Sequence, residues 1–209
     1  MKSLIRESDG GRSQIDFEPV FKRLNEELAK IGQSLELICA GGYVMQLQGH
    51  IATTDVDAFY KSNSEVEKVI RKIGDEFGIN KEDELWLNNS ISEFNKKPPE
   101  QYCELKYSMS NLTVGIVNIL YVVGMKLSPQ SARPKDLDHV ASYLKDSGSK
   151  QPFELSSQLV KMGFNDIDIS VLMEAYGNAY GLEWLADFYT NNESKLQTYG
   201  STEIDKFTI

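Results

Sequence analysis

Two carboxylates one residue apart, Asp55 and Asp57, are the residues in this sequence with the clearest chemical meaning. In a β-strand, residues i and i+2 point to the same face, so both side chains are expected to project side by side from one strand. Two aligned carboxylates repel each other unless a cation lies between them, and oxygen ligands of this kind suit Mg²⁺. Asp55 and Asp57 are therefore the predicted metal ligands, and Mg²⁺ is the expected cofactor.

A glycine pair, Gly41–Gly42, ends the apolar segment that precedes these carboxylates, and Thr53 and Thr54 come directly before Asp55. Because glycine has no Cβ atom, it lets the backbone approach a ligand such as a phosphate closely. A glycine pair or an Asp-x-Asp motif alone is common and usually structural. Their order along the chain predicts a nucleotide site, with the glycines at the phosphates and the carboxylates at the metal.

Alternating helices and strands are expected to position these groups. Apolar residues at spacings of three and four predict a helix over 17–31, and a buried strand is predicted over 35–40. The glycine pair is predicted to form the turn, followed by a short helix over 43–48. A second strand is predicted over 55–60, so that the glycines end one strand and the carboxylates begin the next.

The later segments continue this pattern. Ser64 and Glu67 have the spacing of a capping box, which predicts a helix from Ser64 to about Phe77. Residues 1–14 are expected to lack regular structure. Strands are predicted over 102–109 and 112–117, and helices over 119–127, over 134–144 and in three segments beyond Gly148. This order predicts an α/β or α+β fold, with one domain over 1–147 and a C-terminal helical subdomain over 148–209.

Composition and charge exclude several classes of protein. The chain has 209 residues, 41% hydrophobic and 25% charged, and no apolar run near the roughly 20 residues of a membrane span. The charged N-terminus lacks the apolar core of a signal peptide, so a cytoplasmic protein that does not enter membranes is expected, with Cys39 and Cys103 as free thiols. Two histidines and no cysteine cluster give no support for a zinc site. The net charge of −9 argues against a broad basic surface for nucleic acid.

The glycine pair and the segment Thr53-Thr54-Asp55-Val56-Asp57 resemble the active-site signature of the nucleotidyltransferase fold of the DNA polymerase beta type. The resemblance implies a nucleotidyltransferase-like sheet core. It also implies Mg²⁺-dependent transfer of a nucleoside monophosphate from an NTP to an RNA or protein acceptor, in which metal ions stabilise the attacking and leaving oxygens.

A second block, from Val123 to Val140, is similar to a segment of the bacterial AbiEii-like toxins and of related uncharacterised nucleotidyltransferase-like proteins. The resemblance implies that Lys126, Arg133 and Lys135 contact the triphosphate, that Asp136 fills an acidic position, and that a cognate antitoxin is a partner. The same residues also fit an ordinary helix with solvated charges. Residues 85–89 resemble a Trp-Leu-Asn-Asp element of the uncharacterised proteins, with Asn89 in place of the aspartate.

Two departures from the family pattern keep other functions open. The arginine usually found shortly before the paired aspartates is missing from residues 49–52. The third carboxylate is missing from the predicted strand over 112–117, which leaves Glu104 as its candidate. A catalytically degenerate nucleotide-binding module on the same fold is therefore the alternative to an enzyme. An acidic, antitoxin-like partner of a basic protein is a third hypothesis.

Overall fold

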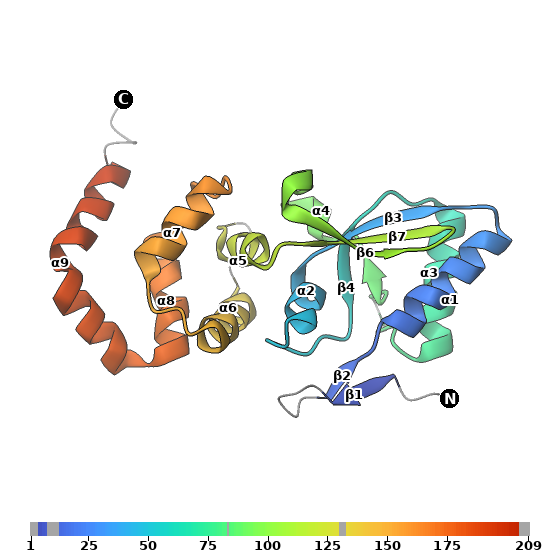
Figure 1. Ribbon diagram of the computed structural model, residues 1–209, viewed down its shortest axis with the longest axis horizontal. Coiled ribbons are helices and arrows are strands. Elements are labelled where there is room, and N and C mark those ends of the chain that lie inside the picture. Colours follow the sequence, from blue (N-terminus) through green and yellow to red (C-terminus); the bar gives the residue numbers. More distant parts are fainter. Residues whose placement is uncertain (1–3, 8–12, 83, 130–132, 205–209) are drawn as a thin grey trace. The chain divides into compact units, whose positions relative to one another are not determined.

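The computed structural model describes residues 4–7, 13–82, 84–129 and 133–204 (Figure 1). Backbone proximity divides the chain into two compact units, Met1–Met125 and Lys126–Ile209. The division comes before the expected boundary at 147/148, because the helix that follows Arg133 packs against a later helix of the second unit. Each unit is described by itself.

The first unit is built on a five-stranded sheet. Its strands are β3 (Leu35–Cys39), β4 (Val56–Phe59), β5 (Leu87–Asn88), β6 (Cys103–Ser108) and β7 (Leu112–Val117). They lie in the order β5-β4-β3-β7-β6, with β3 parallel to β7, β4 parallel to β5, and the other two pairs antiparallel. The sheet is therefore mixed, and the prediction of a mixed α/β fold is confirmed at this level.

Five helices and one 3₁₀ turn are described in the chain up to Leu127. They are α1 (Glu18–Lys30), α2 (Gly41–Leu47), α3 (Ser64–Phe77), α4 (Ile91–Phe94), the 3₁₀ turn Glu100–Tyr102 and α5 (Ile119–Leu127). Helices α1 and α3 pack against each other on one side of the sheet (Figure 1). Two short strands, β1 (Ile5–Glu7) and β2 (Ser13–Ile15), pair near the N-terminus, so the expectation that residues 1–14 lack regular structure is wrong.

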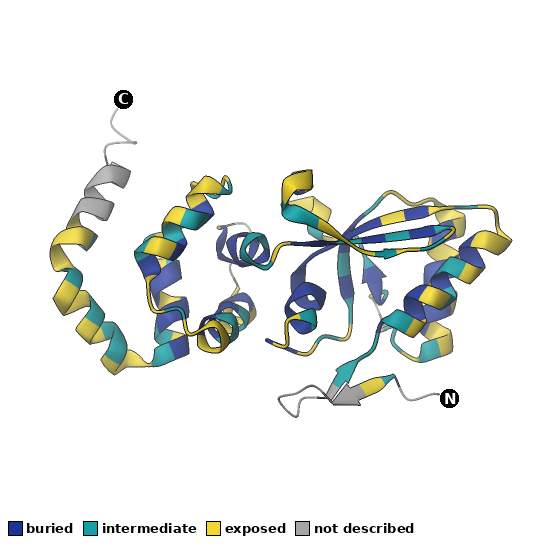
Figure 2. Cartoon of the chain, in the orientation of Figure 1, coloured by how far each residue is buried: buried dark blue, intermediate teal, exposed yellow. Residues whose placement is uncertain are grey.

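The two faces of the sheet differ in burial. On one face, Leu37, Cys39, Val56 and Ala58 are fully buried. Side chains alternate along a strand, so the other face carries Glu36 and Ile38 on β3 and Asp57 and Phe59 on β4. Glu36 is exposed and Asp57 is half-buried. Figure 2 colours the elements of the chain by burial. The face that bears Asp57, called the open face below, is the one on which polar side chains can meet a ligand.

An aromatic cluster packs α1 and α2 together. Phe17 stacks on Trp86 with ring centroids 6.2 Å apart, and Tyr43 of α2 meets Phe17 edge to face at 5.5 Å. The buried Trp86 indole donates a hydrogen bond to the Ile70 carbonyl of α3, 2.9 Å away. The rings pack closely and the Trp86 N–H has an acceptor. This cluster therefore holds α2, and with it the glycine pair, in place.

The N-terminus of α3 corrects one prediction. Asn63 caps the helix, since its side-chain oxygen accepts hydrogen bonds from the backbone N–H groups of Glu65 and Val66, each at 3.0 Å. The expected capping box of Ser64 and Glu67 is therefore wrong, and Glu67 instead accepts a hydrogen bond from Ser62. Asparagine at the position before the helix serves as well as serine for this role.

Strand β6, at one edge of the sheet, pairs irregularly with β7. The register with β7 shifts between Leu105 and Tyr107, which marks a β-bulge. Leu105 is 65% exposed, and Glu104 and Lys106 are exposed beside it. Cys103 at the start of β6 and Cys39 on β3 are both free thiols, as expected, although only Cys39 is buried.

The second unit is helical. It contains α6 (Pro134–Ser147), α7 (Pro152–Lys161), α8 (Ile169–Tyr180) and α9 (Leu182–Ile204). Helix α8 is largely buried against α6, and Tyr180 of α8 donates hydrogen bonds to carbonyl oxygens at the end of α6 and beyond it. Within the ranges that the structure describes, no helix is both long enough and apolar enough to cross a membrane.

Ion pairs join α1 to α3. The Glu27 carboxylate of α1 accepts from Lys72 of α3 at 2.6 Å and from Lys30 at 2.6 Å, and Arg23 lies 2.7 Å from it. Hydrogen bonds from Lys30 and Lys72, together with the Arg23 charge, lower the pKa of Glu27 from 4.5 to about 2. The folded protein therefore favours the ionised carboxylate.

We expect Glu27→Gln to lower the melting temperature at pH 7. A carboxyl whose pKa falls on folding stabilises the protein above its unfolded pKa, and this contribution is lost as pH falls through the folded value. The difference between variant and wild type is therefore expected to shrink between pH 4.5 and about 2. Melting curves across this range measure it. Glu82→Gln, at an exposed residue of the same unit, is the control and is expected to show no such pH dependence. A difference that stays constant down to pH 2 contradicts the prediction.

Candidate functional site

The glycine pair lies directly against Asp57 and Thr53. Gly41 has a φ of +58°, and a Cβ atom built on it would lie 2.5 Å from Asp57 Oδ2. A Cβ atom on Gly42 would lie 2.9 Å from Thr53 Oγ1. Both glycines fall in the first turn of α2 rather than in a turn before it, which differs from the prediction. The site therefore requires glycine at both positions for steric reasons, and at Gly41 also for its backbone conformation.

The Asp55 carboxylate contacts a threonine and a lysine. Thr53 Oγ1 donates to Asp55 Oδ1 at 2.6 Å, and Lys81 Nζ lies 3.3 Å from Asp55 Oδ2. Asp55 precedes β4, whose first residue is Val56, so the predicted strand over 55–60 begins one residue too early. Asp57 lies inside β4 on its open face. The structure thus brings Gly41, Gly42, Thr53 and both aspartates together.

A buried glutamine braces the loop that carries Thr53. Gln46 of α2 is 5% exposed, and its side-chain oxygen accepts from the Thr53 backbone N–H at 2.9 Å. Its amide nitrogen donates to the Ile15 carbonyl at 2.8 Å. Because both ends of this amide are used, Gln46 fixes the distance between α2 and the loop. No sequence signal identifies Gln46, since a lone glutamine in a short helix has no distinctive spacing.

Asn88 is a second residue that sequence reasoning missed. The parallel pairing of β4 and β5 places Asn88 opposite Asp57, so the two side chains are neighbours on one face. The Asn88 side-chain nitrogen is buried and has no partner among the described residues. Asn89, the residue singled out in the sequence, instead donates to the Tyr60 carbonyl at 3.0 Å. The segment 85–89 thus contributes an amide, Asn88, beside Asp57.

The donor set of this site suits Mg²⁺. Mg²⁺ is usually bound by one or two carboxylates, with waters and substrate phosphates completing its shell, so the residues that would hold it here are Asp55 and Asp57. The Lys81 ammonium at Asp55 shows that this carboxylate attracts a cation in the folded chain. No cluster of three or more Asp, Glu, His or Cys residues that could hold a metal occurs among the described residues.

Two predicted site residues differ from this group. Thr54, between Thr53 and Asp55 in the chain, is exposed. Glu104 is on β6, and the strand order puts β7 and β3 between it and β4. Three strand spacings correspond to about 14 Å, too far for Glu104 and Asp57 to share one ion. The structure therefore does not bring Glu104 to the pair.

The predicted basic residues Lys126, Arg133 and Lys135 belong to the second unit, where two of them contact Asp136. Lys126 is 8% exposed, and its ammonium donates to Asp136 Oδ1 at 2.6 Å. Arg133 donates to Asp136 Oδ2 at 2.8 Å, whereas Lys135 is exposed. Burial opposes ionisation of Asp136, but the two cations outweigh it and hold its pKa below the usual value. Lys126 is thus buried at the end of an apolar helix because Asp136 neutralises it.

His139 lies next to these charged residues. Its Nδ1 atom is buried and has no hydrogen-bond partner within the described chain. Burial, together with the charges of Lys126 and Lys135, lowers the pKa of His139 to about 4. The imidazole is therefore neutral at pH 7.

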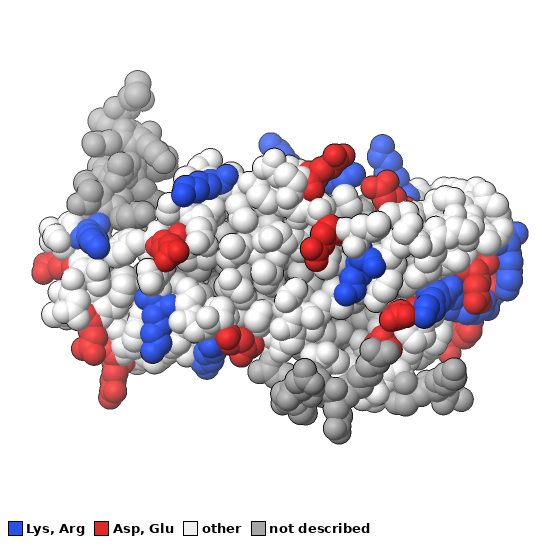
Figure 3. All heavy atoms as spheres, in the orientation of Figure 1, with Lys and Arg blue, Asp and Glu red and all other residues white. Residues whose placement is uncertain are grey.

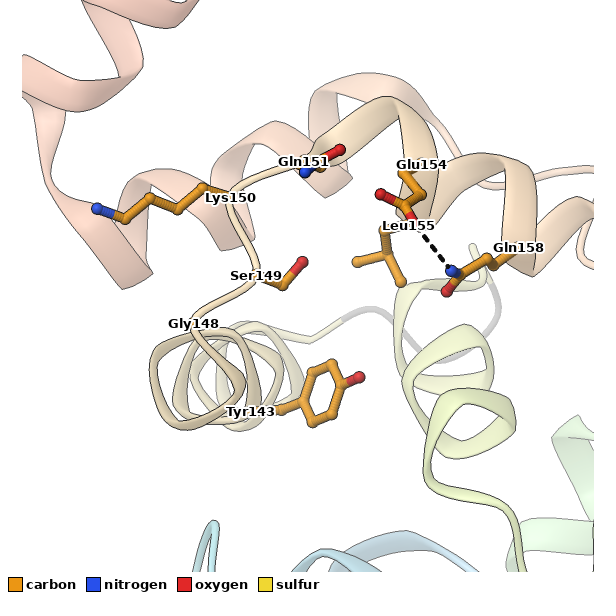
Figure 4. Close-up of a pocket in the computed structure, with 8 residues that line it drawn as sticks. All are labelled: Tyr143, Gly148, Ser149, Lys150, Gln151, Glu154, Leu155 and Gln158. Carbon is orange, nitrogen blue, oxygen red and sulfur yellow. Dashed lines mark hydrogen bonds between the residues drawn. The ribbon is translucent and has the colours of Figure 1, made fainter.

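Two cavities are candidates for a ligand. The larger, of about 700 Å³, lies in the first unit and includes Ile38 and Phe59 of the open face. The smaller, of about 240 Å³, lies in the second unit, where Tyr143 of α6 and Leu155 of α7 face the linking residue Ser149 (Figure 4). Ligand pockets usually have 300–1,000 Å³, so only the first reaches this range.

Comparison with protein-family models, with curated proteins and with solved structures finds no match to this chain.

We expect Gly41→Ala to destabilise the protein more than Gly32→Ala. The two glycines have similar φ values, +58° and +65°, but nothing lies within 4 Å of a Cβ atom on Gly32. The control thus carries the cost of the left-handed conformation alone, about 1–2 kcal/mol. Gly41→Ala must in addition displace Asp57, and we expect at least about 1 kcal/mol more. Urea unfolding measures both variants, and equal losses contradict the close approach.

A double-mutant cycle tests the pairing of Lys126 with Asp136. Asp136→Leu leaves a buried ammonium and is expected to lose about 3 kcal/mol of unfolding free energy. Lys126→Met leaves the Asp136 carboxylate with Arg133 as its partner, so its loss is expected to be smaller. The double variant is expected to lose less than the sum of the two single losses. Denaturant unfolding gives the three values. Additive losses would mean that the two residues do not act as a pair.

Proposed function

We propose that the first unit binds Mg²⁺ and a nucleoside triphosphate at the site formed by Gly41, Gly42, Asp55 and Asp57. We further propose that the protein is a nucleotidyltransferase, which moves a nucleoside monophosphate to an RNA or protein acceptor. The observation that carries the proposal is how closely the glycine pair approaches the segment that bears the carboxylates. A Cβ atom built on Gly41 would lie 2.5 Å from Asp57 Oδ2, and one built on Gly42 would lie 2.9 Å from Thr53 Oγ1.

Each residue has a defined part in the proposed reaction. The glycines keep side chains away, so that phosphate oxygens can approach the backbone. Asp55 and Asp57 hold Mg²⁺, which neutralises charge on the triphosphate when it is bound. Thr53 orients the Asp55 carboxylate, and Asn88 offers an amide beside Asp57. In the transfer, the oxygen of an acceptor hydroxyl group bonds to the α-phosphorus and its proton passes to solvent, while the bond from that phosphorus to the bridging oxygen breaks and pyrophosphate leaves.

Binding of the nucleotide without turnover is the second candidate. It is favoured by the distance of Glu104 from the pair, because no third carboxylate joins Asp55 and Asp57 among the described residues. Asp55 also forms an ion pair with Lys81. Two carboxylates and the phosphate oxygens of the nucleotide can together bind one Mg²⁺. Binding of the nucleotide therefore does not require a second metal ion.

We expect each NTP that binds to do so only with Mg²⁺, and Asp55→Asn/Asp57→Asn to weaken this binding at least tenfold, since about 1.4 kcal/mol of lost metal contact has that effect. Isothermal titration of each NTP, with and without Mg²⁺, measures the binding. The matched control, Glu65→Gln/Glu82→Gln, removes two exposed carboxylates of the same unit and is expected to bind as wild type.

Two outcomes contradict the proposed site: no NTP binding with Mg²⁺, or binding that survives in the double aspartate variant. Release of pyrophosphate from a bound NTP, followed in the presence of RNA or of cell protein, then separates the enzyme from the binding module. Thermal melting of all variants shows whether they are folded.

A further inference from the structure

The larger cavity opens on the same sheet face as Asp57. Ile38 and Phe59, which are paired across β3 and β4, form its apolar floor. Phe59 follows Asp57 by two residues, so the two side chains point the same way, about 7 Å apart along the strand. The cavity therefore lies next to the aspartate site, but none of its lining residues is one of the site's residues.

Cations surround this floor. Lys61, Lys96 and Lys97 line the cavity and are exposed, and none makes an ion pair with another residue of the described ranges. Glu36 is the one carboxylate in the lining. Three lysines against one glutamate give the cavity a local excess of positive charge in a chain whose net charge is −9. Such a reversal of sign favours an anionic ligand.

Amide groups complete the lining. Asn89 Oδ1 is buried and has no partner among the residues that the structure describes, while its nitrogen is occupied by Tyr60. An unpartnered buried acceptor is costly, and a ligand hydroxyl group would satisfy it. Ser92, at the start of α4, adds an exposed hydroxyl group.

We propose that this cavity binds a small phosphorylated molecule, whose carbon skeleton lies on Ile38 and Phe59 and whose phosphate is held by the lysines. The volume of about 700 Å³ suits a ligand of this size. A long nucleic acid is less suited, because the carboxylate of Glu36 lies among the lysines of the lining. Basic and acidic side chains are also interspersed on the face drawn in Figure 3. The proposal requires neither Mg²⁺ nor an NTP, so it stands or falls separately from the nucleotide site.

Titration of the whole protein with ribose 5-phosphate, inorganic phosphate and ribose, in the presence of EDTA, tests the proposal. Backbone amide shifts in NMR spectra report the location, and the signals of Asn89 and Ser92 are expected to move. Ribose 5-phosphate is expected to bind most tightly, inorganic phosphate more weakly and ribose not at all. Asp55→Asn/Asp57→Asn is expected to bind ribose 5-phosphate as wild type does.

Charge variants make the test specific. Lys96→Gln/Lys97→Gln is expected to weaken binding of ribose 5-phosphate about tenfold, since each removes a direct attraction to the phosphate. Lys68→Gln/Lys145→Gln removes the same charge from exposed lysines outside the cavity and is expected to change affinity less than twofold. Glu36→Gln is expected to tighten binding, because it removes the one repulsive charge of the lining.

Three results overturn the proposal. The first is the absence of binding by ribose 5-phosphate, and the second is equal weakening by the two lysine pairs. The third is binding of a 5′-phosphorylated RNA hexamer more than tenfold tighter than that of ribose 5-phosphate, which would assign the cavity to nucleic acid. The lysine and Glu36 variants change exposed side chains, so their melting temperatures are expected to match that of the wild type.

Discussion

The first unit depends on the missing side chains of Gly41 and Gly42. Helix α2 begins so close to β4 and to the loop before it that a single added carbon would collide with Asp57 or Thr53. Gln46, one turn further along the same face of α2, holds this loop through a hydrogen bond from the Thr53 backbone N–H. Close approach and hydrogen bonding thus set one geometry for the glycines, the threonine and both carboxylates. The aromatic rings of Phe17 and Trp86 then hold this assembly on the sheet.

Two carboxylates, Asp55 and Asp57, belong to this arrangement, and Thr53 and Lys81 both contact Asp55. Carboxylates that lie near each other repel, and local costs of this kind occur preferentially at functional sites. In the second unit, both oxygens of the buried Asp136 carboxylate accept from cationic side chains, those of Lys126 and Arg133. A buried charge with a complete set of partners is explained by structure alone.

Much of the fold could be predicted from local patterns. Helices α3 and α5 and strand β7 have the predicted bounds, because their apolar spacing is clear over several residues. Strand β5 was missed, since two residues are too short to show any period. The glycines and aspartates could be grouped from their order in the sequence, but Gln46, Lys81 and Asn88 could not. These residues reach the site only through the tertiary packing of α2 and of the segment that follows α3, which no spacing records.

The sheet ends on one side at β5, which is two residues long, and on the other at β6. An outer strand offers unused N–H and carbonyl groups to any other extended chain, and an apolar residue such as Leu105 makes that edge more adhesive. The bulge after Leu105 interrupts the straight row of these groups, and Glu104 and Lys106 flank it with charge. A strand from another molecule would therefore meet an irregular backbone and exposed charged side chains at this edge. The irregularity within the β6–β7 ladder therefore makes this edge a poor template for the addition of a strand from another chain.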